Sequence, residues 1–185
     1  MPRASRAASV PAPPVLAVLR FPRTLPQLPG RAGATTPTGE LVMVFDATQR
    51  GKQVDVTDPT GAPLGRVAFA GRGRWVLTAP HTGATLAEAD ARNGVRASIG
   101  GGPWAVVKGR GEEWDLLWET TPLLAARQVP RKVARGCVDV WVHDPACTPV
   151  VVAFVLHVRR LQVAAAAADQ LIIQQMLTAP PPTTS

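Results

Sequence analysis

The longest uninterrupted apolar segment of the chain, residues 149–177, constrains the fold more than any other feature. At helical spacing, its apolar residues recur on one narrow face. Five alanines at 164–168 favour an α-helix, and the prolines at 180–182 end it. The segment therefore predicts a long C-terminal helix whose core face consists of Phe154, Val158, Leu161, Ala165, Ala168, Ile172 and Met176.

Two other interpretations of this segment stay open. A transmembrane helix needs roughly 20 predominantly apolar residues, whereas His157, Arg159 and Arg160 interrupt the apolar run here. The β-branched run at 150–158 also fits a strand, followed by a helix from Arg159, because periodicity alone does not separate the two structures. We favour a helix buried in the core of the domain.

Repeated turn sequences precede the helix. Asp58-Pro59 with Gly61 is typical of a turn between two strands, and the pattern returns 22 residues later at Gly83. A partial third copy spans residues 144–150. Hairpins at this spacing predict a meandering antiparallel sheet or barrel of about ten short strands. We therefore expect one mainly β domain over residues 40–178, made of these strands and the long C-terminal helix.

Residues 1–39 have a different composition. They hold eight prolines, five arginines and no acidic residue, without apolar periodicity. We expect a disordered extension, or a start codon assigned too far upstream, and a second disordered tail at 179–185. The rest of the chain is nearly balanced in charge, and no dense basic face with interleaved aromatic residues suggests a nucleic-acid partner. Cys137 and Cys147 are too few for a disulfide scaffold, which favours free thiols and a cytoplasmic location.

The hairpin residues 58–65 and 82–86, followed by the apolar segment 149–168, resemble the tubby-like superfamily. This group includes tubby C-terminal domains, LURP-one-related proteins, phospholipid scramblases and small bacterial relatives. The Ala-, Gly-, Pro- and Arg-rich composition, typical of high-GC coding, is compatible with a bacterial source. The resemblance implies a closed β-barrel around a hydrophobic C-terminal helix. It also implies a non-enzymatic module that binds anionic lipid headgroups, or an unknown protein, at the membrane periphery.

Candidate sites are sparse. The three histidines and the acidic residues show no catalytic or metal-binding spacing, so we expect no enzyme, metal or cofactor. In Asp-Pro contexts, an aspartate such as Asp58 normally caps its own turn. The densest basic cluster supplies the predicted headgroup site, with each residue contributing on the order of 1 kcal/mol near a membrane: Arg127, Arg131, Lys132 and Arg135. The alternative is a soluble scaffold or a small-ligand-binding barrel.

Overall fold

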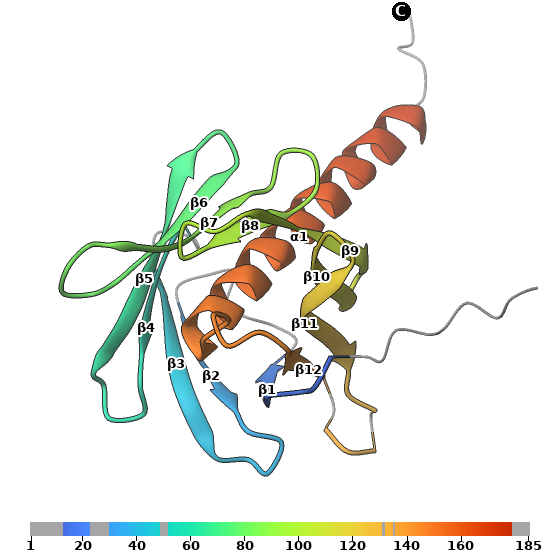
Figure 1. Ribbon diagram of the computed structural model, residues 1–185. Coiled ribbons are helices and arrows are strands. Elements are labelled where there is room, and N and C mark those ends of the chain that lie inside the picture. Colours follow the sequence, from blue (N-terminus) through green and yellow to red (C-terminus); the bar gives the residue numbers. More distant parts are fainter. Residues whose placement is uncertain (1–12, 23–29, 49–51, 131, 135, 179–185) are drawn as a thin grey trace, which may run out of the picture.

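The computed structural model describes residues 13–22, 30–48, 52–130, 132–134 and 136–178. Within these residues the chain forms a closed antiparallel β-barrel around the first part of one long helix, α1 (Pro149–Thr178). Figure 1 shows α1 entering among the strands and projecting beyond them on the opposite side. The predicted fold class is therefore confirmed.

The strands follow a simple up-and-down order. Each pairs with its neighbours in sequence, and the last pairs with the first, so that no sheet edge stays open. In chain order they are β1 (Ala17–Pro22), β2 (Gly30–Thr35), β3 (Leu41–Thr48), β4 (Gln53–Thr57), β5 (Pro63–Gly71), β6 (Arg74–Thr78), β7 (Thr85–Asp90), β8 (Arg96–Ile99), β9 (Trp104–Arg110), β10 (Glu113–Trp118), β11 (Thr121–Gln128) and β12 (Cys137–Val142).

Alternation of apolar and polar residues decides which side chains face the interior. In β12 the valines Val138, Val140 and Val142 are buried, whereas Asp139 is half-buried and Trp141 is exposed, as the pattern predicts. In β10, Trp114 and Leu116 are buried, whereas Trp118 at the end of the strand is 45% exposed. The pairing of β10 with β11 shifts register between Leu116 and Leu117, where Leu123 of β11 is the extra residue.

The helix divides into two parts with different surroundings. Every residue from Val150 to Val158 is buried, because the barrel surrounds this part on all sides. Residues 165–171 are exposed. Of the predicted core face, Phe154 and Val158 are confirmed, and Leu161 packs against the core while half-buried.

The prediction is wrong for Ala165 and also for Ala168, which lie on the projecting part where no strand reaches them. The side chains of Ile172 and Met176 lie outside the described residues.

The structure also bears on the two other interpretations of residues 149–177, a strand at 150–158 and a transmembrane helix. A strand at 150–158 is wrong, because the helix begins at Pro149 and the amide of Val152 donates to the carbonyl of Thr148. Residues 149–171 are long and apolar enough to cross a membrane, but half of their most apolar stretch is buried within the barrel. Burial in a barrel gives these side chains the dry surroundings that their composition requires.

The start of the domain at residue 40 is a wrong prediction. The strand β1 pairs along its length with β12, and β2 pairs with β3, so residues before 40 close the barrel. Leu19 and Phe21 face the core, while Arg20 donates to both carboxylate oxygens of Asp139 at 2.7 and 2.9 Å. Prolines on both sides of β1 made the short alternation of apolar and polar residues difficult to recognise from the sequence. Residues 1–12, 23–29 and 179–185 lie outside the described residues.

Candidate functional site

The up-and-down order gives the barrel two distinct ends. At the exit end, α1 leaves the barrel among the turns that follow β5, β7, β9 and β11. At the start end, α1 begins among the turns that follow β2, β4, β6, β8 and β10. Because alternate turns of an antiparallel barrel share an end, residues far apart in the sequence come together in two opposite rings.

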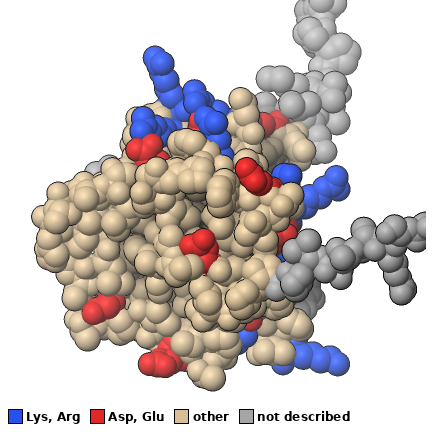
Figure 2. Space-filling view, viewed as in Figure 1, with Lys and Arg blue, Asp and Glu red and all other residues tan. Residues whose placement is uncertain are grey.

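The exit end carries exposed cations. These side chains are exposed and make no ion pair with another described residue: Lys52, Arg72, Lys108, Arg110 and Lys132. They come from the connections after β3, β5 and β11 and from the end of β9. Figure 2 shows Lys and Arg mainly along the upper and right margins of the view, the side toward which α1 projects.

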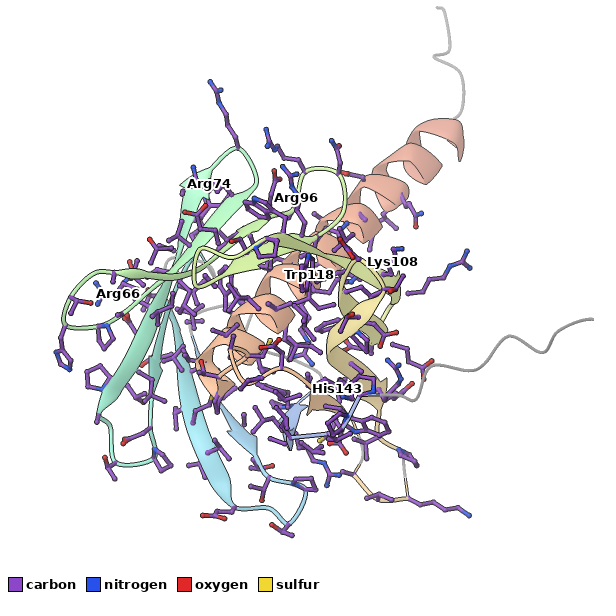
Figure 3. All side chains as sticks on the ribbon, viewed as in Figure 1. Arg66, Arg74, Arg96, Lys108, Trp118 and His143 are labelled. Atoms are coloured by element: carbon purple, nitrogen blue, oxygen red, sulfur yellow. The ribbon has the colours of Figure 1, made fainter. Side chains whose placement is uncertain are left out.

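Further arginines at this end are held by carboxylates. Arg92 and Arg96 both bind Asp90, at 2.6 and 3.1 Å, and these guanidinium groups hold the pKa of Asp90 well below its usual range. Arg96 also stacks over the ring of Trp104, 4.9 Å from its centre. Two cations share one carboxylate, so this cluster keeps a net positive charge. Figure 3 places Arg96 on the side from which α1 emerges.

The basic cluster predicted from sequence is only partly brought together. Arg127 binds Asp115 at 2.7 Å and donates to the carbonyls of Trp114 and Ala126, so its charge is largely engaged in the wall of the barrel. Lys132 is exposed in the loop after β11, and Arg131 and Arg135 lie outside the described residues. The exposed cations therefore belong to the whole ring of turns rather than to this loop alone.

Arg159 and Arg160 lie where the helix leaves the barrel, directly after the buried residues 150–158. Arg159 donates to the carbonyl of Gly109 at 3.2 Å and to Gln162, and Arg160 lies 3.5 Å from Glu112. Burial lowers the pKa of Arg159 below its usual value. These contacts fix the helix to the hairpin between β9 and β10.

The start end has the opposite charge. Its described turns carry acidic side chains and no Lys or Arg: Glu40, Asp58, Glu119 and Asp144. Asp58 accepts hydrogen bonds from the amides of Thr60 and Ala62, which confirms its predicted capping role and lowers its pKa. The barrel is thus electrically polarised along its axis, positive where α1 leaves and negative where it begins.

The interior offers little room. A cavity between α1 and strands β3 to β5 has about 10 Å³ available to the centre of a water molecule, enough for about one water. His157 borders this cavity, and its ring lies edge-on to the ring of Trp75, with 5.6 Å between the two ring centres. Cys137 and Cys147 form no disulfide with a described residue, and burial raises the pKa of Cys147 to about 12. Among the described residues, no group of three His, Cys, Asp or Glu is placed to hold a metal ion.

Sequence reasoning missed the polarity because charge was counted along the chain rather than by alternate turns. Part of the signal was present: Glu40, Asp58, Glu119 and Asp144 lie in connections at one end, whereas most connections at the other end contain Lys or Arg. Correct strand boundaries were needed to assign each turn to an end.

Comparison of the sequence with protein-family models and with curated proteins gave no match. One solved structure, an X-ray structure of a protein from Arabidopsis thaliana, is similar in fold with a TM-score of 0.55. The match covers 79% of this chain and 91% of the plant protein, at 13% sequence identity. At that identity the similarity establishes a shared architecture for most of both chains, and no more.

Proposed function

We propose that this chain is a non-enzymatic, tubby-like module that docks its exit end on an anionic membrane surface. The observation that carries the proposal is the charge polarity of the barrel, with unpaired cations around the exit end and acidic turns at the start end. Basic residues close to an anionic bilayer contribute roughly 1 kcal/mol each, while acidic groups are repelled. The charge polarity of the barrel therefore favours the orientation in which the exit end faces the membrane.

The projecting part of α1 supports the same orientation. It leaves the barrel inside the ring of cations and carries exposed alanines and Leu171, which is 58% exposed, together with Asp169 and Gln170. A helix with exposed apolar side chains beside cations has the composition of a segment that lies in the headgroup region. The cations would meet the phosphates while the helix end contacts the acyl boundary.

The tubby-like assignment rests on the repeated hairpins and the helix-filled barrel. The fold shared with the plant structure is compatible with it. The alternative, a barrel that holds a small ligand, has less support because α1 fills the interior and leaves a cavity of only about 10 Å³ beside β3 to β5. A scaffold without a membrane role would give no reason for cations to gather at the helix exit.

Co-sedimentation of the full chain with vesicles tests the proposal. We expect binding to phosphatidylcholine vesicles that contain phosphatidylserine, weaker binding at high salt, and little binding to phosphatidylcholine alone. Replacing Lys52, Arg72 and Lys132 by glutamine should weaken binding at least about tenfold. A matched control introduces the same change in net charge at the start end through Ala62→Glu, Ala84→Glu and Thr120→Glu, and should bind within about twofold of the wild type.

Two results would overturn the proposal. Equal losses in both triple variants would show that only net charge matters, not the exit end. Equally tight binding of the chain to a DNA duplex at the same salt concentration would show that the cations attract any polyanion.

A further inference from the structure

We propose that the start end of the barrel carries a docking pocket for a basic peptide segment that inserts one bulky apolar side chain. The pocket lies between the turns after β8 and β10 and the connection from β12 to α1. Its volume is about 260 Å³, and its walls include Ile99, Pro103, Trp118, Leu123 and Asp144. It is at the opposite end from the proposed membrane contact and does not depend on it.

The pocket walls are mainly apolar, and one large wall residue, Trp118, is exposed to solvent. Trp118 is 45% exposed at the end of β10, the last residue of that strand at this end of the barrel. Tryptophan at an exposed position beside an apolar pocket is typical of residues that dominate the energy of protein interfaces. The volume is below the range of about 300–1,000 Å³ that is usual for small-molecule sites. It is better suited to a single side chain from a partner.

The acidic residues around the pocket indicate that the partner should carry positive charge beside its apolar side chain. Asp144 lines the pocket, and Glu119 directly follows Trp118. Oδ1 of Asp144 accepts the amide of Ala146 at 2.8 Å, while Oδ2 makes no hydrogen bond within the described part of the chain. No Lys or Arg occupies the described turns of this end, so arginine or lysine flanking the apolar anchor would meet uncompensated carboxylates.

Charge complementarity also argues against a membrane as the occupant. An anionic surface would be repelled by Glu119, Asp144, Glu40 and Asp58, all of which lie at this end. A partner with positive charges and one apolar side chain satisfies both parts of the surface. With its exit end on the membrane, the molecule would present this pocket away from the bilayer.

The test uses a fluorescein-labelled peptide with a central leucine, two arginines on each side and glycine-serine ends. Fluorescence anisotropy with the full chain should show saturable binding that weakens with salt. A peptide with serine in place of leucine should bind at least about tenfold more weakly, because its anchor is lost. A peptide with glutamates in place of the arginines should not bind.

Two protein variants remove the charge while preserving the backbone. Asp144→Asn keeps the side-chain acceptor for Ala146, and Glu119→Asn suits the positive φ of 56° at this residue. We expect the double variant to bind the basic peptide at least about tenfold more weakly, and Trp118→Ala to have an effect of similar size. Glu40→Gln, a charge removed from the same end but outside the pocket, should change affinity less than about twofold.

No saturable binding of the basic peptide by the wild type would overturn the proposal. So would an unchanged affinity in Trp118→Ala, or equal affinity for the basic and acidic peptides. If sedimentation instead shows salt-sensitive self-association that the Asn double variant abolishes, and the peptide does not compete, the occupant is a second copy of the chain and the proposal is wrong.

Discussion

The two parts of α1 have similar helical geometry but opposite surroundings. From Val150 to Val158 the helix is enclosed, and its side chains pack against every face of the barrel. From Ala165 to Leu171 it is exposed, and this part combines alanines and Leu171 with the polar Asp169 and Gln170. The reach of the barrel and the change in composition therefore both decide how much of α1 is core.

The height of the barrel accounts for the change. A strand of six residues, such as β1, is about 20 Å long, and the usual tilt of about 40° reduces its height to roughly 15 Å. At 1.5 Å per residue, this height encloses about ten residues of helix. That estimate agrees with the buried span from Val150 to Val158. The remainder of α1 must therefore extend beyond the strands.

Truncation of Phe154 tests the enclosed part and should have the largest effect on stability. Its side chain is fully buried, so Phe154→Ala leaves a cavity and should lower the free energy of unfolding by roughly 3–5 kcal/mol. The matched variant on the projecting part, Leu171→Ala, should change it by less than about 0.5 kcal/mol. Chemical denaturation of both variants measures the difference, and similar losses would contradict the division of the helix.

Gly109→Ala tests the point where the two parts meet. Gly109 has a φ of 128°, and a Cβ there would lie 2.4 Å from the carbonyl oxygen of Glu113. The substitution should cost roughly 2–3 kcal/mol and displace the carbonyl that accepts Arg159. Gly111→Ala is the control, since its added Cβ meets open space, and should cost about 1 kcal/mol from its φ of 56° alone. Equal thermal shifts would show that the close approach at Gly109 is unimportant.

The connection that leads into the enclosed part should make stability sensitive to alkaline pH. Burial raises the pKa of Cys147 from 9.0 to about 12, so the folded protein keeps the neutral thiol while the unfolded chain ionises first. This contribution should be constant below pH 9 and decline between about pH 9 and 12.

Because the chain has no tyrosine, few other groups titrate in that range. Thermal melts from pH 8 to 11 should show a shallower decline for Cys147→Ala than for the wild type. Parallel declines in the two proteins would rule out a contribution from Cys147.

Removal of the projecting part should have the smallest effect on stability and a distinct effect on binding. A chain that stops after Ala164 keeps the enclosed residues, so its melting temperature should stay within about 2 °C of the wild type. Its affinity for anionic vesicles should fall by about threefold or more, because the exposed apolar residues are lost. Unchanged vesicle binding would confine the membrane contact to the cations, and a large loss of stability would mean that the projecting part contributes to the core.

The sequence was sufficient for the antiparallel hairpins, the long helix and the turn at Asp58, because each depends on local periodicity or turn chemistry. Closure of the barrel did not follow from these patterns, which fitted a sheet as well as a barrel. The sequence was also not sufficient for β1 and β2, since six-residue strands flanked by prolines differ little from an extended tail until their partners are known. The register shift between β10 and β11, at Leu123, becomes visible only once the two strands are paired.

The candidate sites show the same limit. Arg127 and Lys132 belong to the same predicted cluster, yet Arg127 binds Asp115 and Lys132 is exposed, because β11 ends at Gln128 between them. The polarity of the two ends depends on which turns share an end, and that assignment required every strand boundary.

The most direct test of the central claim asks which end of the barrel faces an anionic membrane. Environment-sensitive labels can be placed in a Cys137→Ser background, where buried Cys147 stays unreactive. Val133→Cys marks the exit end, and Thr120→Cys marks the start end; both positions are exposed. On phosphatidylserine vesicles with spin-labelled lipids, we predict strong quenching at 133 and little at 120. Equal quenching at both positions, or stronger quenching at 120, would contradict the proposed orientation.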